Sequence, residues 1–223
     1  MKILGIDTTT RFMCIGVYDN GKSYEYIIET GHKLSTLLAL HLKRILDSLG
    51  WKAQDLDYLA CGLGPGSFTG IRVGVSAIKG LAWALKKPVV GVPTLDLLAE
   101  NALEIEEDIA VAVDAKRSLI YCAMYQKKAG RIKRSSPYML RSPDEFCRNV
   151  RPGSVIIGDA CGIYRAQMIK GILGAQLIEK DSWYPKPENL IALVLEQIKN
   201  KKISNVFKIK PIYLYPKECQ IKK

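Results

Sequence analysis

The sequence has few of the residues from which catalytic and metal sites are usually built. It contains two histidines, His32 and His41, and six cysteines that never form a Cys-x-x-Cys pair. On one helix, two residues nine positions apart point to roughly opposite sides, so these histidines cannot bind one metal ion together. Scattered cysteines of this kind are typical of reduced, mostly buried thiols. The sequence therefore argues against a metallopeptidase, a zinc site and a disulfide framework.

Long apolar segments are also missing. Before Asp7 the chain has only a short apolar run, so we expect no signal peptide. The most apolar window, residues 68–85, is interrupted by Arg72, Lys79 and three glycines, and it falls short of a membrane span. We expect a cytoplasmic protein that has no membrane partner.

What remains is an ordinary globular composition with an uneven positive charge. The chain has 223 residues, of which 48% are hydrophobic and 25% charged, with a net charge of +11. Residues 1–102 contain 11 basic and 9 acidic residues, against 22 and 13 in residues 103–223. A field of this sign attracts polyanions such as transfer RNA, although solvated surface lysines explain the same excess. We expect the second half to carry most of this field.

Hydrophobic periodicity predicts an α/β pattern in the first half. Residues 2–7, 13–18 and 23–28 are expected strands, and Asn20-Gly21 between the last two is typical of a two-residue hairpin turn. Helices are expected over residues 33–49 and from Ser67 or Thr69 to residue 85, and a third from Thr94. Residues 56–63 and 88–92 read as buried strands between these helices. The order predicts a mixed sheet with helices on its faces.

The pattern begins again after residue 102. Strands are expected at residues 109–113, 119–125, 155–158 and 176–179, with helices starting at Ser142 and spanning residues 188–199. Ser142, Pro143 and Glu145 supply an N-cap, a suitable first residue and a capping box. We therefore predict two α/β domains, residues 1–102 and 103–223. The basic end, residues 199–223, can pack against either one.

Two aspartates at strand ends are the strongest candidates for enzymatic chemistry. Asp7 and Asp114 each follow an apolar strand, and two such carboxylates could hold a magnesium nucleotide. A phosphate-binding turn needs glycine where backbone N–H groups approach phosphate closely, yet Thr8 and Thr9 follow Asp7, and Ala115 follows Asp114. A capping or turn role is the competing interpretation. Asp7, Thr8, Thr9 and Asp114 therefore stay weak nucleotide-binding candidates, and no catalytic residue is predicted.

A glycine-rich segment follows the strand at residues 56–63 and opens the next helix. It reads Gly62-Leu63-Gly64-Pro65-Gly66-Ser67-Phe68-Thr69-Gly70-Ile71-Arg72-Val73-Gly74. It has neither a P-loop ending nor a dinucleotide-binding pattern. Together with Lys79-Gly80-Leu81-Ala82, Gly5-Ile6-Asp7-Thr8-Thr9 and Val113-Asp114-Ala115-Lys116-Arg117, it resembles the signature of the TsaB (YeaZ) family. The resemblance covers the first 126 residues well and the rest loosely.

The resemblance implies a fold and a set of partners. The fold is the actin-like, Hsp70-like ATPase (ASKHA) class, with two ribonuclease-H-like domains. The implied function is that of a non-catalytic scaffold, an inactive paralogue that binds TsaD in the complex forming N6-threonylcarbamoyladenosine on tRNA. TsaE, an ATPase, would join through the TsaB–TsaD complex, and a homodimer would form without TsaD. The resemblance implies no intrinsic cofactor or metal, since ATP, ADP and the metal ion belong to the partners, and tRNA contact is indirect.

Two departures from the family pattern affect partner contacts. The family usually has Arg-x-His-Ser before its first helix, where this chain has Gly31-His32-Lys33-Leu34-Ser35. Near the end, the family's Tyr-Leu-Arg is replaced by Tyr213-Leu214-Tyr215. We expect both changes to leave the fold intact.

The helix over residues 68–85 is expected to be a partner surface. Its only charges are Arg72 and Lys79, and Gly70 and Gly74 are one turn apart, which would let another helix approach closely. Burial between the sheet and the preceding helix explains the same facts without a partner. The predicted partner-binding residues are Leu38, His41, Leu42, Ile45, Gly70, Arg72, Val73, Gly74, Ser76, Ala77, Lys79 and Trp83.

Two other functions remain open on the sequence. One is an ATP-dependent, kinase-like enzyme on the same fold, against which the missing phosphate-binding glycines argue. The other is a tRNA-binding module that uses a basic cluster without an interleaved aromatic residue. That weakly predicted cluster consists of Lys127, Lys128, Arg131, Lys133 and Arg134.

Overall fold

The chain divides into two units whose boundaries differ from the expected ones. The computed structural model describes residues 1–216, apart from the side chain of His32, so Cys219 and the end of the basic tail lie outside the described residues. Unit 1 comprises Met1–Leu97 and Pro185–Pro211, and unit 2 comprises Leu98–Tyr184 with the described residues from Ile212 onward. The predicted division at residue 102 thus falls a few residues late. The chain returns to unit 1 at Pro185, earlier than the basic end at residues 199–223, for which the sequence left this packing open.

Unit 1 is built on a mixed sheet of five strands within the described residues, in the order β3-β2-β1-β4-β5. β1 (Lys2–Asp7), β2 (Phe12–Asp19) and β3 (Lys22–Glu29) are antiparallel neighbours, while β4 (Tyr58–Gly62) and β5 (Val89–Val92) run parallel to β1. Asn20 and Gly21 form the predicted turn, with φ angles of 45° and 101°. This is the ribonuclease-H-like strand order implied by the resemblance.

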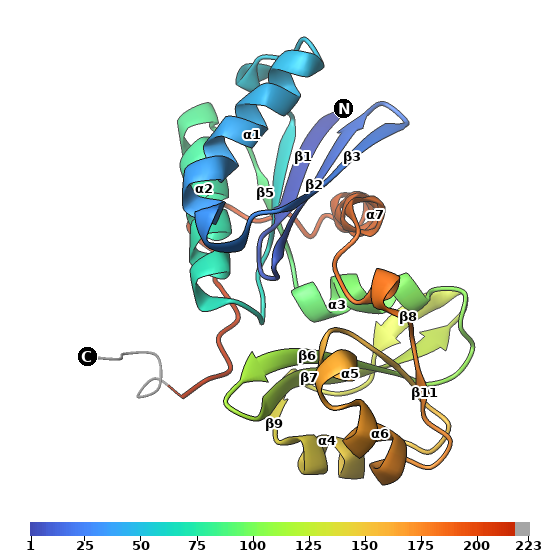
Figure 1. Ribbon diagram of the computed structural model, residues 1–223. Helices are drawn as coiled ribbons and strands as arrows, with labels where there is room; N and C mark the ends of the chain where they lie inside the picture. The colour runs from blue at the N-terminus through green and yellow to red at the C-terminus, as the bar shows by residue number, and fades with distance from the viewer. Residues whose placement is uncertain (217–223) are drawn as a thin grey trace. The chain divides into compact units, whose positions relative to one another are not determined.

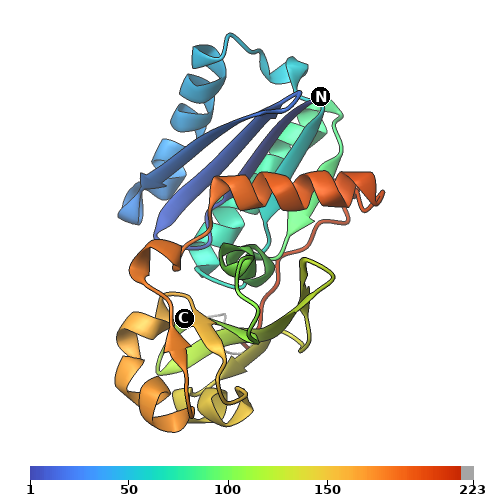
Figure 2. The same cartoon turned by 90° about the vertical axis from the view of Figure 1, so that its right-hand side faces the viewer.

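Helices cover both faces of this sheet (Figures 1 and 2). On one face, α1 (Leu34–Ser48) and α2 (Phe68–Leu85) cover a core that includes Leu4, Ile6 and Ile15. On the other face, α7 (Pro187–Lys199) packs on β1 and β2 through Leu190, Ile191 and Val194. Gly16 in β2 permits this close approach, because a Cβ there would lie 2.7 Å from Ile191 Cγ1.

The position of α7 corrects an expectation. The helix at residues 188–199 was predicted to complete the second domain, but it belongs to unit 1 and fills the sheet face opposite α1 and α2. Its apolar stripe needs a sheet to cover, and nothing in a local periodicity says which sheet that is. The 3₁₀ helices Gly31–Lys33 and Ala53–Asp55 and the segment after α7 complete unit 1.

Unit 2 contains the second mixed sheet, in the order β11-β10-β6-β7-β8, with β9 also paired to β7. Its strands are β6 (Ile109–Lys116), β7 (Leu119–Lys128), β8 (Arg131–Arg134), β9 (Met139–Arg141), β10 (Val155–Ile157) and β11 (Gln176–Leu177). The helices are α4 (Pro143–Asn149), α5 (Ala160–Ile163) and α6 (Arg165–Gly171), with short 3₁₀ turns at Glu100–Ala102 and Lys180–Ser182. α3 (Thr94–Ala99) crosses the boundary between the units.

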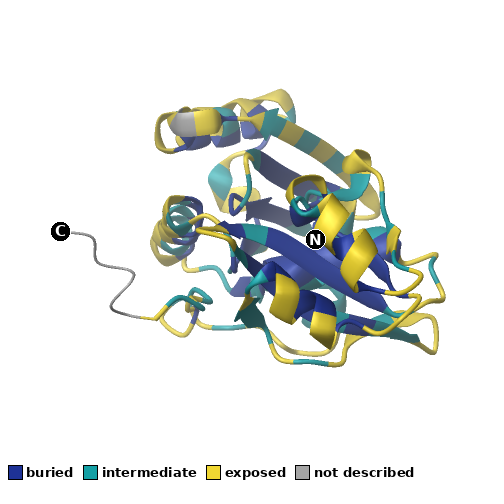
Figure 3. Ribbon diagram, turned by 60° about the horizontal axis from the view of Figure 1, so that its bottom comes forward, coloured by how far each residue is buried: buried dark blue, intermediate teal, exposed yellow. Residues whose placement is uncertain are grey.

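Burial follows the sheets closely. Most residues of β1, β2, β4 and β6 are buried, whereas β3, an edge strand, has exposed and half-buried residues (Figure 3). Cys14, Cys61, Cys122, Cys147 and Cys161 are free and buried, as predicted for the cysteines that the structure describes. Burial raises the pKa of the Cys61, Cys122 and Cys161 thiols to about 12 in each case. Within residues 1–216, no helix is both long enough and apolar enough to cross a membrane.

Candidate interaction surface and strand-end carboxylates

The carboxylate of Asp7 is enclosed at the end of β1. It is fully buried, and its Oδ1 accepts hydrogen bonds from the Thr9 backbone N–H (2.8 Å) and the Thr9 hydroxyl (2.7 Å). Its Oδ2 accepts a third from the Thr94 hydroxyl at the start of α3 (2.8 Å). Thr94 Oγ1 in turn accepts from the Gly64 N–H (3.2 Å), so the carboxylate connects β1, the glycine-rich turn and α3.

This arrangement gives the predicted nucleotide candidates of unit 1 an internal role. Burial raises the pKa of Asp7, and the hydrogen bonds from Thr9 and Thr94 offset part of that shift. Thr8 and Thr9 are each 2% exposed, and the Thr8 hydroxyl donates to the Gly70 carbonyl (2.7 Å). Asp7, Thr8 and Thr9 are therefore buried and bonded within the chain, and the contact from the Thr9 N–H gives Asp7 the turn role of the competing interpretation.

The glycine-rich turn folds against the same strand end. Ser67 caps α2 by accepting a hydrogen bond from the Gly70 N–H (3.2 Å), and its own N–H donates to the Thr9 carbonyl (2.7 Å). A Cβ at Gly70 would lie 2.0 Å from the Thr8 carbonyl oxygen, and one at Gly74 would lie 2.2 Å from Thr8 Oγ1. Gly70 and Gly74 thus leave room for Thr8, directly after β1 in the same chain. The prediction that these two glycines let a partner helix approach was wrong.

The remaining predicted partner residues divide by exposure. Leu38, Leu42 and Ile45 in α1 are buried against unit 1's own core, so they have no surface to offer a partner. Arg72, Ser76 and Trp83 are exposed along the outer side of α2, and His41, Val73, Ala77 and Lys79 are half-buried beside them. The candidate partner surface is therefore the outer stripe of α2, defined here by the exposed residues Thr69, Arg72, Ser76 and Gly80 before the last turn of the helix.

The outer stripe carries little charge. Its single ionic group is Arg72, whose guanidinium lies 3.7 Å from the centroid of the Phe68 ring. α1 contacts α2, and His41 on α1 is half-buried. Among the side chains that the structure describes, no group of three or more His, Cys, Asp or Glu residues could hold a metal ion.

In unit 2, Asp114 at the end of β6 has partners from its own chain. Its Oδ1 accepts from the Lys116 backbone N–H (2.9 Å), and its Oδ2 accepts from Lys116 Nζ (2.6 Å). The bond from Nζ raises the pKa of the Lys116 side chain. The Asp114 N–H donates to Asp159 Oδ1 (2.8 Å), and burial raises the pKa of Asp159. Tyr215 donates to the carbonyls of Ala115 (2.9 Å) and Lys116 (3.3 Å). Tyr215, where this chain departs from the family pattern, therefore supplies a donor to this turn.

The predicted tRNA cluster forms one edge of the second sheet. Lys127 and Lys128 in β7 pair with Arg131 and Ile132 of β8 across the Ala129-Gly130 turn, and Lys133 and Arg134 follow in β8. Lys127 is bound to Glu106 at 2.7 Å, and Arg134 lies over the Tyr138 ring at 3.9 Å. Glu106 thus neutralises part of the positive charge of the cluster. Tyr138 is an aromatic neighbour that the sequence pattern did not predict.

Sequence reasoning missed the residues that complete these sites. Thr94 and Asp159 lie 87 and 45 residues from the aspartate that each one contacts, so no local motif joins them. Thr94 was noted only as a helix start, although a buried carboxylate needs hydrogen-bond donors and Thr94 lies two residues beyond the buried strand β5. Asp159 likewise lies two residues beyond β10, and this position was the available signal.

Comparison with known proteins gives a consistent result. A family model described as "TsaD: tRNA N6-adenosine threonylcarbamoyltransferase" matches residues 29–167. The "tRNA threonylcarbamoyladenosine biosynthesis protein TsaB" of Bacillus subtilis is 30% identical over 230 residues, which cover 100% of this chain and 97% of the relative. The Escherichia coli protein of the same name is 32% identical over 129 residues, 57% of this chain and 56% of the relative.

Solved structures agree with the sequence matches. The structure of YeaZ from Pseudomonas aeruginosa superposes with a TM-score of 0.83 at 26% identity, over 96% of this chain and 99% of that one. The fold described above is therefore shared along nearly the whole length of both chains.

Proposed function

Because this chain belongs to the TsaB family of tRNA threonylcarbamoyladenosine biosynthesis proteins, we propose that it acts there as a non-catalytic subunit that binds TsaD. TsaE would join through the TsaB–TsaD pair, and ATP and the metal ion would be bound by the partner subunits. Transfer RNA would meet the assembled complex rather than this chain's strand-end carboxylates.

The hydrogen bonds of the two strand-end aspartates support the proposal that the chain is not a catalyst. Asp7 is buried under three hydrogen bonds from Thr9 and Thr94, and Asp114 is held by Lys116. A carboxylate that binds a magnesium nucleotide must present free oxygens to the ion. Reaching such a state would require Asp7 to break internal bonds in a buried site, where each lost bond to a charged group costs about 1.5–3 kcal/mol.

The outer stripe of α2 supports the choice of partner surface. A face whose one ionic group is Arg72 is depleted in charge, as the centres of protein interfaces are. The TsaD model matches residues 29–167, a range that includes α1 and α2, so TsaD would present equivalent helices. Two such helix pairs could pack together as a bundle, and a second copy of this chain would take the same place when TsaD is absent.

Substitution of Ser76 by Arg tests the proposal. Ser76 is exposed, so an arginine there should leave the monomer folded while placing a charge in the centre of the outer stripe. Val73 is less suitable because it packs against the core of unit 1. Co-elution with TsaD in size-exclusion chromatography should be lost in S76R and kept in the control S23R, which alters an exposed serine in β3. Retained co-elution of folded S76R would contradict the assigned surface.

Calorimetry tests the absence of catalysis. Titration of the isolated chain with magnesium ATP should give no saturable heat, and the chain alone should release no phosphate. Tight binding with turnover would instead support the kinase-like alternative, and it would refute the internal role that we assign to Asp7.

A further inference from the structure

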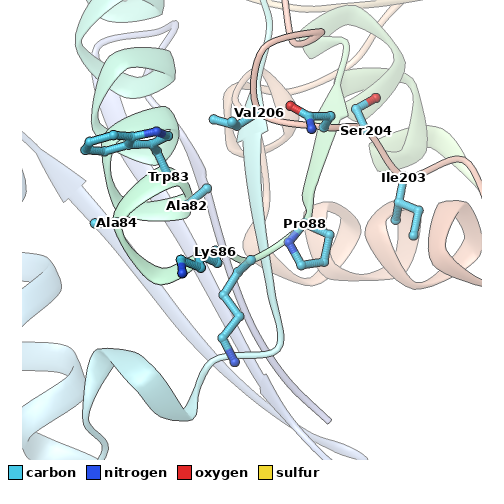
Figure 4. A pocket seen from close by; sticks show the side chains of 10 residues that line it. Ala82, Trp83, Ala84, Lys86, Pro88, Ile203, Ser204 and Val206 are labelled. Carbon is cyan, nitrogen blue, oxygen red and sulfur yellow. The ribbon is translucent and has the colours of Figure 1, made fainter.

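A groove lies in unit 1 beyond the end of α2, and the proposed function does not use it. One wall is the last turn of α2, with Ala82, Trp83 and Ala84, followed by Lys86 and Lys87. The other wall is the segment after α7, residues 200–211, which we term the strap, and Pro88 lies between the walls (Figure 4). The groove has a volume of about 770 Å³, within the range of small-ligand sites.

The groove is held in shape by bonds between its walls and the sheet. Ser204 in the strap and Val89 in β5 form an antiparallel bridge, with N–H to O distances of 2.9 and 3.2 Å. Further along the strap, Ile209 is buried in the core of unit 1, and its carbonyl accepts a hydrogen bond from Lys79 Nζ (3.3 Å). The Phe207 N–H donates to Asn205 Oδ1 (3.0 Å). The strap therefore does not need to fold upon binding.

Exposed aromatic and apolar side chains gather at this groove. Trp83 is 67% exposed and Ile203 is 43% exposed, and both line it. Phe207, one residue beyond the lining residue Val206, is 71% exposed. An indole exposed to this extent on a helix end offers a flat stacking surface rather than a contribution to the core.

The charge around the groove is positive. Its ten lining residues include Lys86 and Lys87 and no carboxylate, and neither lysine has an acidic partner within the described part of the chain. The strap itself adds Lys201, Lys202, Lys208 and Lys210 without an acidic residue. Because the strap returns to unit 1, that unit holds 17 basic and 10 acidic residues against 16 and 12 in unit 2. The net charge is therefore +7 in unit 1 and +4 in unit 2, although the sequence halves 1–102 and 103–223 differ in the other direction, at +2 and +9.

We propose that this groove binds a single-stranded segment of RNA, with a base stacked on Trp83 and the phosphates next to Lys86 and Lys87. Planar aromatic surfaces combined with a positive groove are the two features by which proteins bind unpaired nucleic acid. An acidic protein segment would satisfy the lysines but leave the indole without a matching planar group. The choice of RNA over other polyanions rests on the proposed function in tRNA modification.

Trp83 was predicted as a TsaD contact, and the groove assigns it a different ligand. Trp83 is seven residues after Ser76, about two turns further along α2. Substitutions at the two positions should therefore separate the two functions.

Fluorescence anisotropy with the isolated chain tests the proposal. The probe is a labelled single-stranded oligouridylate of about 12 nucleotides, with an unmodified tRNA transcript as a second ligand and polyglutamate as the acidic competitor. W83A should weaken oligouridylate binding about 5- to 150-fold, while W83F should retain most of it. K86Q/K87Q should reduce the slope of log K against log salt by about 1.4.

Matched variants separate this groove from other surfaces. K22Q/K33Q removes two exposed lysines elsewhere in unit 1, and K128Q/R131Q alters the basic edge of unit 2; both should leave the affinity nearly unchanged. S76R should keep RNA binding, and W83A should keep co-elution with TsaD, so failure of either proposal can be recognised by itself.

Three results would overturn the groove proposal. The first is an absence of oligouridylate binding, or binding that W83A does not weaken. The second is binding that only K128Q/R131Q removes, which would assign RNA to the unit 2 edge. The third is loss of TsaD co-elution in W83A with RNA affinity unchanged, or polyglutamate competing as strongly as RNA, since either would make the groove a protein contact.

Discussion

Replacing each of the three glycines of α2 by alanine should change the free energy of unfolding in opposite directions at different positions. In an exposed helix interior, Gly→Ala stabilises a protein by about 0.5–1 kcal/mol, because alanine restricts the unfolded chain and favours the helix. Gly80 is exposed, and a Cβ there would meet nothing within 4 Å. G80A should therefore raise the free energy of unfolding by about that amount.

The same change at Gly74 should be destabilising. Its Cβ would lie 2.2 Å from Thr8 Oγ1, more than about 1 Å inside the optimum for non-bonded atoms. Overpacking of this kind costs about 1–3 kcal/mol, which outweighs the gain in helix propensity. At Gly70 the contact is with the Thr8 backbone oxygen at 2.0 Å, which cannot rotate away, so G70A should cost more than G74A.

Chemical denaturation followed by the fluorescence of Trp51, which is buried in the same core, measures these differences. Replacing Thr8 by alanine should relieve G74A, since the clashing oxygen is removed, at the cost of about 1 kcal/mol for its bond to the Gly70 carbonyl. The double variant T8A/G74A should then be more stable than the sum of the single changes predicts, by about 1 kcal/mol or more. Stabilisation of G74A to the same extent as G80A would refute the packing role of Gly74 and return it to the partner surface.

Two further predictions concern stability alone. Burial and the neighbouring Glu188 raise the pKa of Glu25 above 4.5, although Lys186 opposes them, so its ionised form is disfavoured in the folded state and stability falls as pH rises through that window. E25Q should flatten this fall and raise the free energy of unfolding slightly at pH 7, by less than about 1 kcal/mol because the group is mostly exposed; an unchanged pH profile would contradict this. S142A removes the capping box observed at α4 and should cost about 1 kcal/mol, read from urea midpoints, whereas S142D should restore most of it.

Local signals predicted the secondary structure well because their causes lie within a few residues. Asn20-Gly21 forms its turn because both residues adopt positive φ, and Ser142 forms its capping box with Glu145 three positions later. Ser67 caps α2 by the same short-range geometry. The strands β8 and β9 were missed, since residues 131–134 and 139–141 are short and lack a period-2 pattern of burial.

Long-range placement could not be predicted from the same signals. The apolar stripe of α7 fits either sheet, and only the folded chain shows that Gly16 in β2 leaves room for Ile191. The charge balance depended on this placement, because the lysines of the strap follow α7 into unit 1. The candidate site was affected as well: Thr94 and Asp159 approach Asp7 and Asp114 only through the sheets.

α2 shows how a correct observation led to a wrong assignment. Small residues one turn apart indicate that some backbone approaches the helix closely, and for Gly70 and Gly74 that backbone is the end of β1 at Thr8. At 100° per residue, Ser76 and Trp83 lie about 180–240° around the helix from these glycines. One side of such an apolar helix can therefore be buried within its own chain while another side contacts a partner. Its glycine side is occupied within unit 1, and its opposite side is the one that remains exposed for TsaD at Ser76 and for RNA at Trp83.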